Sequence, residues 1–149
     1  MRLVPTRGSA IAAGALALAL AAAVLVPAAQ ANHGNAVKKC EQEYGGNFHS
    51  MPSLPIQADN GTRLGRLALS WAWKDGKRRT CAVVIRKSHG SVVRSSVKIK
   101  RAGSNRRPHK RVARSRFGVG PVAQRARCFK VRGTIAGGWV VIPRFCYGG

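Results

Sequence analysis

A strict alternation of apolar and polar residues is the feature that most constrains how this chain folds. In the segment RLGRLALSWAWKDG, one face of an extended chain carries large apolar side chains: Leu67, Leu69, Trp71 and Trp73. The other face carries Arg66, Ser70 and Lys74, which is the pattern of a half-buried strand. The Asp-Gly pair in KDGK favours a tight turn, and RRTCAVVIRK alternates on the way back. The sequence therefore predicts a β-hairpin over residues 64–87.

Three further segments have β character. GSVVRSSVKIKR alternates so that Val93, Val97 and Ile99 face inward, and the outward residues are Arg94, Ser96, Lys98 and Lys100. FGVGPVAQRARCFKVRG and TIAGGWVVIPRFC predict more strands, the last one bent around a Gly-Gly pair. NAVKKCEQEYGG predicts one short helix, capped by Asn35.

These elements amount to five to seven strands and at most one short N-terminal helix, without the strand–helix alternation of an α/β fold. We therefore expect a mainly β protein, an antiparallel sandwich or small barrel.

The first 31 residues have the three parts of a secretory signal peptide. A charged start, MRLVPTR, precedes an Ala/Leu/Val stretch over residues 11–26, and PAAQA then offers Ala29 and Ala31 as the small residues of a cleavage site. The apolar stretch is shorter than the ~20 residues that a spanning helix needs. We expect export, cleavage after Ala31, and a single secreted β domain over residues 32–149. That chain contains no second apolar segment, so we expect no stable membrane insertion after cleavage.

The expected mature chain is strongly and unevenly charged. It keeps 25 basic residues and four acidic ones, a formal charge of +21. The acidic residues are Glu41, Glu43, Asp59 and Asp75. None follows Asp75, whereas 20 basic residues do. Because repulsion of this size disfavours a compact chain, the fold needs an additional restraint.

Four cysteines can supply that restraint: Cys40, Cys81, Cys128 and Cys146. An even count in an exported chain predicts two disulfides. Of the three possible connectivities we favour Cys40–Cys81 and Cys128–Cys146, because the last two cysteines lie on neighbouring strand candidates. A metal site or other cofactor is not expected, because no C-x-x-C pair exists and the histidines are scattered.

The basic stretch over residues 94–116 is the strongest functional signal. Ten of its 23 residues are Lys or Arg and none is acidic. Residues 94–101 belong to the predicted strand, whereas residues 102–116 lack apolar periodicity and predict a long loop. We expect the basic side chains of both parts to bind polyanions: Arg94, Lys98, Lys100, Arg101, Arg106, Arg107, Lys110, Arg111, Arg114 and Arg116.

The expected ligands of this stretch are nucleic acid, teichoic acid or an anionic membrane, bound through phosphates without sequence specificity. The alternative is that the excess charge serves solubility alone. The three tryptophans, Trp71, Trp73 and Trp139, are expected in the core, since alternate Trp next to Leu on a strand is usually buried. An exposed tryptophan would instead favour stacking on the sugars of a wall polymer.

Signals for catalysis are weak, and we expect no enzyme. Glu41 and Glu43 lie two residues apart on the predicted helix and therefore point to different faces. A secreted hydrolase such as a basic ribonuclease would need a base, a histidine and an arginine in one cleft. Glu41, His89 and Arg86 are candidates that no spacing supports. A small protease inhibitor is a further alternative, but the loop at 102–116 is rich in sites for trypsin-like enzymes.

A series of short motifs gives a resemblance to a known family. It begins with C-x-x-x-Y at Cys40 and Tyr44 and continues through LG…L, GK before TCAVVIR, V…S…IKR and GPV. It ends with ARC, GTI and Cys146 near a Gly-ended tail. In order and approximate spacing, most of the mature chain resembles the spore-associated protein A-like exported proteins of filamentous, spore-forming bacteria.

This resemblance implies a small exported protein found with spores or the culture fluid, with no established reaction and no active-site residues. The partners to expect are then anionic polymers at the cell or spore surface. The present chain is more basic than such relatives, so anion binding would belong to this variant and not to the family.

Overall fold

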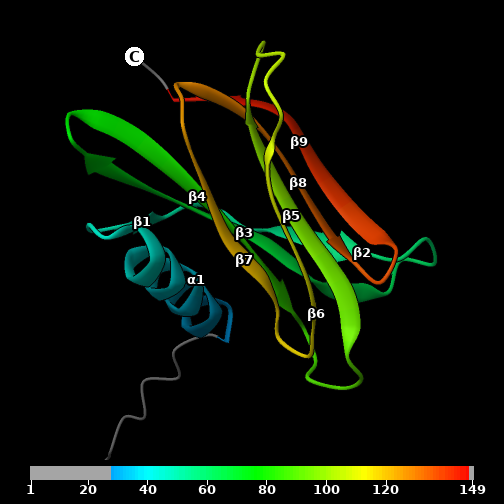
Figure 1. The fold of residues 1–149 in the computed structure, drawn as a ribbon. Helices are drawn as coiled ribbons and strands as arrows, with labels where there is room; N and C mark the ends of the chain where they lie inside the picture. Colours follow the sequence, from blue (N-terminus) through cyan, green and yellow to red (C-terminus); the bar gives the residue numbers. More distant parts are fainter. Residues whose placement is uncertain (1–27, 148–149) are drawn as a thin grey trace, which may run out of the picture.

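The computed structural model describes residues 28–147, in which one helix accompanies nine antiparallel strands of a single sheet (Figure 1). The elements are α1 (Ala28–Tyr44), β1 (His49–Ser50), β2 (Leu54–Gln57), β3 (Arg63–Lys74), β4 (Lys77–Arg86), β5 (Val93–Arg101), β6 (His109–Ser115), β7 (Gly118–Arg125), β8 (Cys128–Ile135) and β9 (Gly138–Cys146). The strand order is β6-β5-β8-β9-β2-β3-β4-β7, and β1 adds to β3. Because β6 and β7 at the two ends of this order also lie in contact, the sheet curls into a nearly closed barrel, which confirms the predicted mainly β fold.

The predicted hairpin is confirmed as β3 and β4. Their register runs without a break from Gly65 opposite Arg86 to Lys74 opposite Lys77. At the turn, Asp75 and Gly76 have φ values of 54° and 66°. Positive φ at both central residues matches the right-handed twist of the two strands, so the Asp-Gly pair determines this turn locally.

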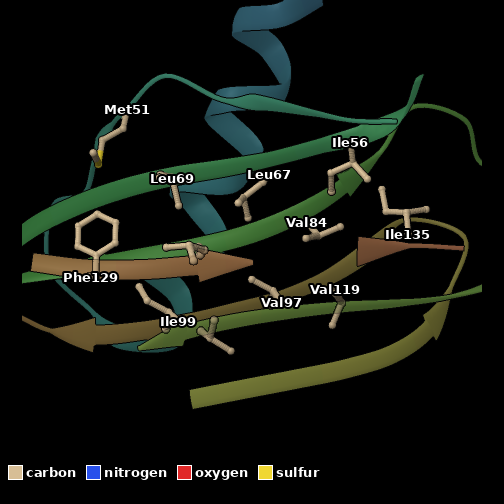
Figure 2. Packing of buried hydrophobic residues seen from close by; sticks show 13 residues of the cluster. Met51, Ile56, Leu67, Leu69, Val84, Val97, Ile99, Val119, Phe129 and Ile135 are labelled. Carbon is tan, nitrogen blue, oxygen red and sulfur yellow. The ribbon is translucent and has the colours of Figure 1, made fainter. Parts of the chain in front are cut away.

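The barrel interior is a continuous apolar core (Figure 2). The alternating side chains of β3 and β5 point into it, including Leu67, Leu69, Val97 and Ile99. Phe129 of β8 is the largest fully buried side chain of the described residues. The inward pattern predicted for these two strands is thus confirmed, except at the exposed Trp73.

The opposite face of β3 is also buried, so the prediction of a half-buried strand is wrong. Arg66 and Ser70, predicted to face solvent, are only 5% and 1% exposed. Helix α1 covers this face and packs against β3, β4 and β7 through a second cluster: Ala36, Cys40, Phe48, Ala68, Ala72, Cys81, Val83 and Ala123 (Figure 1). The small alanine side chains of β3 leave room for the helix. The alternation of apolar and polar residues in β3 alone cannot show that a helix packs on its second face.

The helix is longer than its sequence pattern indicates. It includes Asn35, which is therefore not the cap, and it ends at Tyr44 as predicted. Gly45 has φ 65°, and its N–H donates to the Glu41 carbonyl at 2.8 Å, so a left-handed glycine terminates the helix. The signal peptide predicted over residues 1–31 falls mostly outside the described residues and stays a prediction. Within residues 28–147, no helix has the length and apolar character to cross a membrane.

Two segments differ from the predicted strand count. Residues 109–115, expected to be part of a long loop, form β6 and pair with β5 from Val93 opposite Ser115 to Ile99 opposite His109. The segment predicted over residues 117–133 contains two strands, β7 and most of β8, and the predicted last strand over residues 134–146 is the end of β8, a turn at Ala136 and Gly137, and β9. Strand β6 lies at the edge of the strand order and is mostly exposed. Its sequence therefore lacks the alternation of apolar and polar residues by which a strand is predicted.

Both predicted disulfides are confirmed. Cys40–Cys81 joins α1 to β4, with 6.2 Å between the Cα atoms. Cys128–Cys146 joins two residues that lie directly opposite each other on β8 and β9. The first disulfide anchors the helix to the barrel, and the second secures the C-terminal strand.

We predict that loss of Cys40–Cys81 destabilises the protein more than loss of Cys128–Cys146, because the two bonds span 41 and 18 residues. Each bond is expected to contribute about 2–4 kcal/mol, and the chain-entropy model gives a difference of about 0.7 kcal/mol. Urea unfolding of the two double Cys→Ala variants of residues 32–149 measures both losses. Equal losses, or the reverse order, would contradict this ordering.

Candidate functional site

Basic side chains form rows across three adjacent strands on the outer surface of the barrel. Arg94 lies opposite Arg114 in the pairing of β5 with β6. Lys98 lies opposite both Lys110 of β6 and Arg132 of β8. Directly opposed residues of antiparallel strands project to the same face, with Cβ atoms about 5 Å apart. With Lys100 opposite Lys130, seven cations share this surface, the open cationic face: Arg94, Lys98, Lys100, Lys110, Arg114, Lys130 and Arg132.

None of the seven cations of the open cationic face forms an ion pair within residues 28–147. The two ion pairs of the described chain lie elsewhere, between Arg111 and Glu43 at 2.8 Å and between Arg125 and Asp75 at 3.0 Å. The helix covers the barrel over β3, β4 and β7 and leaves this side uncovered (Figure 1). A shallow depression on the face is lined by backbone and side chains of β5, β6 and the β8–β9 turn. The surface is therefore an exposed, single-sign array.

The ten residues predicted to bind polyanions separate into four groups, the last of which is Arg111 alone. Five of them form the open cationic face together with two residues of β8. Arg101, Arg106 and Arg107 line a hollow of about 570 Å³ at the end of the barrel, beside the β5–β6 turn. Arg116 lies in the β6–β7 turn.

Arg111 points away from this surface. It lies opposite Val97, whose side chain is in the core, so it projects from the other face of β6. There it pairs with Glu43 of α1, and this hydrogen bond raises the pKa of the Arg111 guanidinium. Sequence reasoning missed Lys130 and Arg132, although their alternation with buried Val131 was a usable signal.

Exposed aromatic rings accompany the cations, so the prediction that the tryptophans are buried is wrong for two of three. Trp71 packs against the core, but Trp73 and Trp139 are 59% and 55% exposed. The Arg132 guanidinium lies 5.6 Å from the Trp139 ring. Each exposed indole thus has a guanidinium beside it, since Arg78 lies 5.1 Å from the Trp73 ring.

Arg78 is held among three aromatic rings at the end of the barrel. Its guanidinium carbon lies 4.2 Å from the centre of the Tyr147 ring and 4.8 Å from that of Trp71. The Tyr147 hydroxyl is hydrogen-bonded to the Thr80 hydroxyl. Burial raises the pKa of Tyr147, while Thr80 and Arg78 act in the opposite direction.

The residues considered for a ribonuclease site are each engaged in local structure. The Glu41 carboxylate accepts the Phe48 N–H at 3.1 Å. The Arg86 guanidinium donates to the carbonyls of Ser115 and Arg116, each at 3.3 Å, and the His89 ring contacts that of Phe117. The separate partners of Glu41 and Glu43 confirm that they point to different faces. Among residues 28–147, no group of three or more potential metal ligands comes together.

Comparisons of the chain with models of protein families, with characterised proteins and with solved structures find no match. The resemblance to spore-associated protein A-like proteins stays a prediction. Function is accordingly inferred from the chemistry of the surface.

We predict that Tyr147 makes the stability of the protein fall at alkaline pH. Its folded-state pKa lies above the ordinary value of about 10, so the unfolded chain loses this proton first and stability declines as the pH rises above about 10. Tyr147→Phe cannot ionise, so its stability deficit relative to the wild type should shrink between about pH 8 and pH 11. Urea unfolding at both pH values measures that deficit. Both proteins carry the same lysines, whose titration therefore cancels, and a constant or widening deficit would contradict the prediction.

Proposed function

We propose that this protein is an exported, non-catalytic protein that adheres to anionic polymers through the open cationic face. The observation that carries the proposal is the register of β6, β5 and β8, which places seven cations on one uncovered surface. The ligand is a phosphate-rich polymer, namely nucleic acid, teichoic acid or the headgroups of an anionic membrane. The predicted resemblance to spore-associated protein A-like proteins supports a ligand at the cell or spore surface.

Electrostatics favours a binding role over a role in solubility. Like charges directly opposite each other on neighbouring strands destabilise a sheet, and here Arg94 faces Arg114 while Lys98 faces two cations. A bound polyanion would relieve this repulsion. Solubility alone would be served as well by dispersed charges, and acidic residues serve it better than basic ones.

The geometry suits an extended ligand without sequence readout. Same-face residues repeat about every 7 Å along a strand, and neighbouring strands lie about 4.8 Å apart. The result is a grid of positive charge on the outer wall of the barrel, which can contact successive phosphates but is too broad to enter a groove and read base edges. Binding is then expected to release counterions and to weaken steeply with salt.

The two disulfides support an extracellular setting, because such bonds form and persist in oxidising compartments. They agree with the predicted signal peptide, and together these features support export. Cross-linking of this kind also suits a chain that must stay folded while carrying a large net charge.

We predict that the mature protein, residues 32–149, is retained on heparin and on duplex DNA columns well above ~0.15 M salt, the physiological level of screening. Replacing Lys98, Lys110 and Arg132 with Gln should lower the elution salt. In solution, the slope of log K against log salt should fall by about three, or roughly one per lost phosphate contact. Elution of the wild type at or below ~0.15 M salt would refute polyanion adhesion.

The matched control replaces Lys38, Arg63 and Lys87 with Gln, which removes the same charge from exposed positions outside the face. An equal shift for the control would show that net charge acts without a site. Hydrolysis of a fluorogenic RNA by the wild-type protein would contradict the non-catalytic part of the proposal.

A further inference from the structure

A second hollow, of about 680 Å³, opens at the end of the barrel where the β3–β4 turn, the end of β5 and the β7–β8 connection meet. Figure 1 shows these segments at the same end of the molecule as the C-terminus. The hollow, here called the barrel mouth, is lined by Trp73, Gly76, Lys77, Arg78, Arg101, Arg125, Ala126, Arg127 and Tyr147. Its volume falls within the range of small-ligand sites.

Trp73 reaches the barrel mouth because of its position on β3. It continues the row of Leu67, Leu69 and Trp71, whose side chains face the core, but it lies past the end of the barrel. The residue is therefore 59% exposed, although an exposed ring of this size forgoes a large gain from burial. The row that builds the core thus ends in an aromatic surface available to a ligand.

Arg78 gives the barrel mouth a fixed positive charge next to this indole. Arg78 lies directly opposite Trp73 in the β3–β4 register, and its guanidinium is in contact with the rings of Trp71, Trp73 and Tyr147. The Nε atom of Arg78 is buried and has no hydrogen-bond partner in the described structure. The guanidinium is thus held in place by contacts with three aromatic rings.

The remaining lining combines apolar surface with cations. Lys77, Arg101 and Arg127 carry no ion pair in the described chain, and Arg125 pairs with Asp75. Arg101 and Arg125 also line the neighbouring hollow of about 570 Å³. That hollow continues past Lys100, a member of the open cationic face, so a site with aromatic rings adjoins a strongly cationic path.

We propose that the barrel mouth binds an unpaired base of a single-stranded nucleic acid by stacking on Trp73, while the adjoining cations hold its phosphates. An exposed aromatic ring beside a positively charged groove is the combination that binds single strands. A duplex would not fit, because its base faces are already stacked. A glycerol-phosphate polymer has no ring to place on the indole. The site goes beyond adhesion through the open cationic face, and either one can fail without the other.

The test compares three labelled ligands on the mature protein: a short oligothymidylate, an abasic deoxyribose-phosphate oligomer of equal length, and heparin. Fluorescence anisotropy should show tighter binding of the oligothymidylate than of the abasic oligomer. Trp73→Ala should weaken oligothymidylate binding by roughly 5- to 150-fold, the range measured for one stacked base. It should leave abasic and heparin binding unchanged, because no charge is altered.

Trp139→Ala is the matched control, since Trp139 is equally exposed and also lies beside a guanidinium. It should leave the preference for bases intact. Trp73→Phe should keep most of the preference and Trp73→Leu should abolish it, which separates ring stacking from an effect of side-chain volume on folding.

Equal wild-type affinity for the oligothymidylate and the abasic oligomer would overturn the proposal. So would a preference that disappears in Trp139→Ala but not in Trp73→Ala. If Trp73→Ala weakens heparin binding as much as oligothymidylate binding, the ring would be assigned to glycan stacking instead. Heparin binding without a base preference would leave adhesion through the open cationic face standing, whereas loss of heparin binding with a base preference would refute adhesion alone.

Discussion

Burial of the β3–β4 hairpin on both faces is the constraint on which the rest of the structure depends. One face supplies Leu67 and Leu69 to the barrel core, and the other holds Ala68 and Ala72 under α1. The Cys40–Cys81 disulfide secures this arrangement covalently. Because α1 is placed over β3, β4 and β7, no other element within residues 28–147 covers the opposite side of the barrel, and the outward residues of β5, β6 and β8 face solvent there.

The few acidic residues reinforce this division. Glu43 joins α1 to Arg111 of β6, and Asp75 joins the β3–β4 turn to Arg125 of β7. Exposed pairs of this kind contribute about 0–1 kcal/mol each to stability. Their main effect is therefore to determine which cations keep an uncompensated positive charge. They neutralise cations beside the helix and at the hairpin tip, and none compensates the open cationic face. The uncovered side of the barrel therefore keeps seven cations that form no ion pair within residues 28–147.

Much of the fold could be predicted because its signals are local. The Asp-Gly turn, the inward residues of β3 and β5 and the Cys128–Cys146 pair follow from short-range patterns. Strand β6 could not be predicted, since an exposed edge strand has no buried face and therefore no apolar period. The burial of Arg66 and Ser70 could not be predicted either, because it depends on a helix from a distant part of the chain that packs over β3.

The sequence by itself determined the charge, the number of cysteines available for disulfides and the alternation that sends basic side chains of β5 outward, because composition and period-two geometry are properties of the chain alone. Only the tertiary structure decided which cations share a surface. Strand register brings Lys130 and Arg132 next to β5 and turns Arg111 toward the helix. It also decided that the row containing Trp73 extends past the barrel's end, because the limits of a core are set by neighbouring strands. The difference arises because the period of a strand determines which of its side chains share a face. Pairing between distant segments determines which other strands lie beside that face.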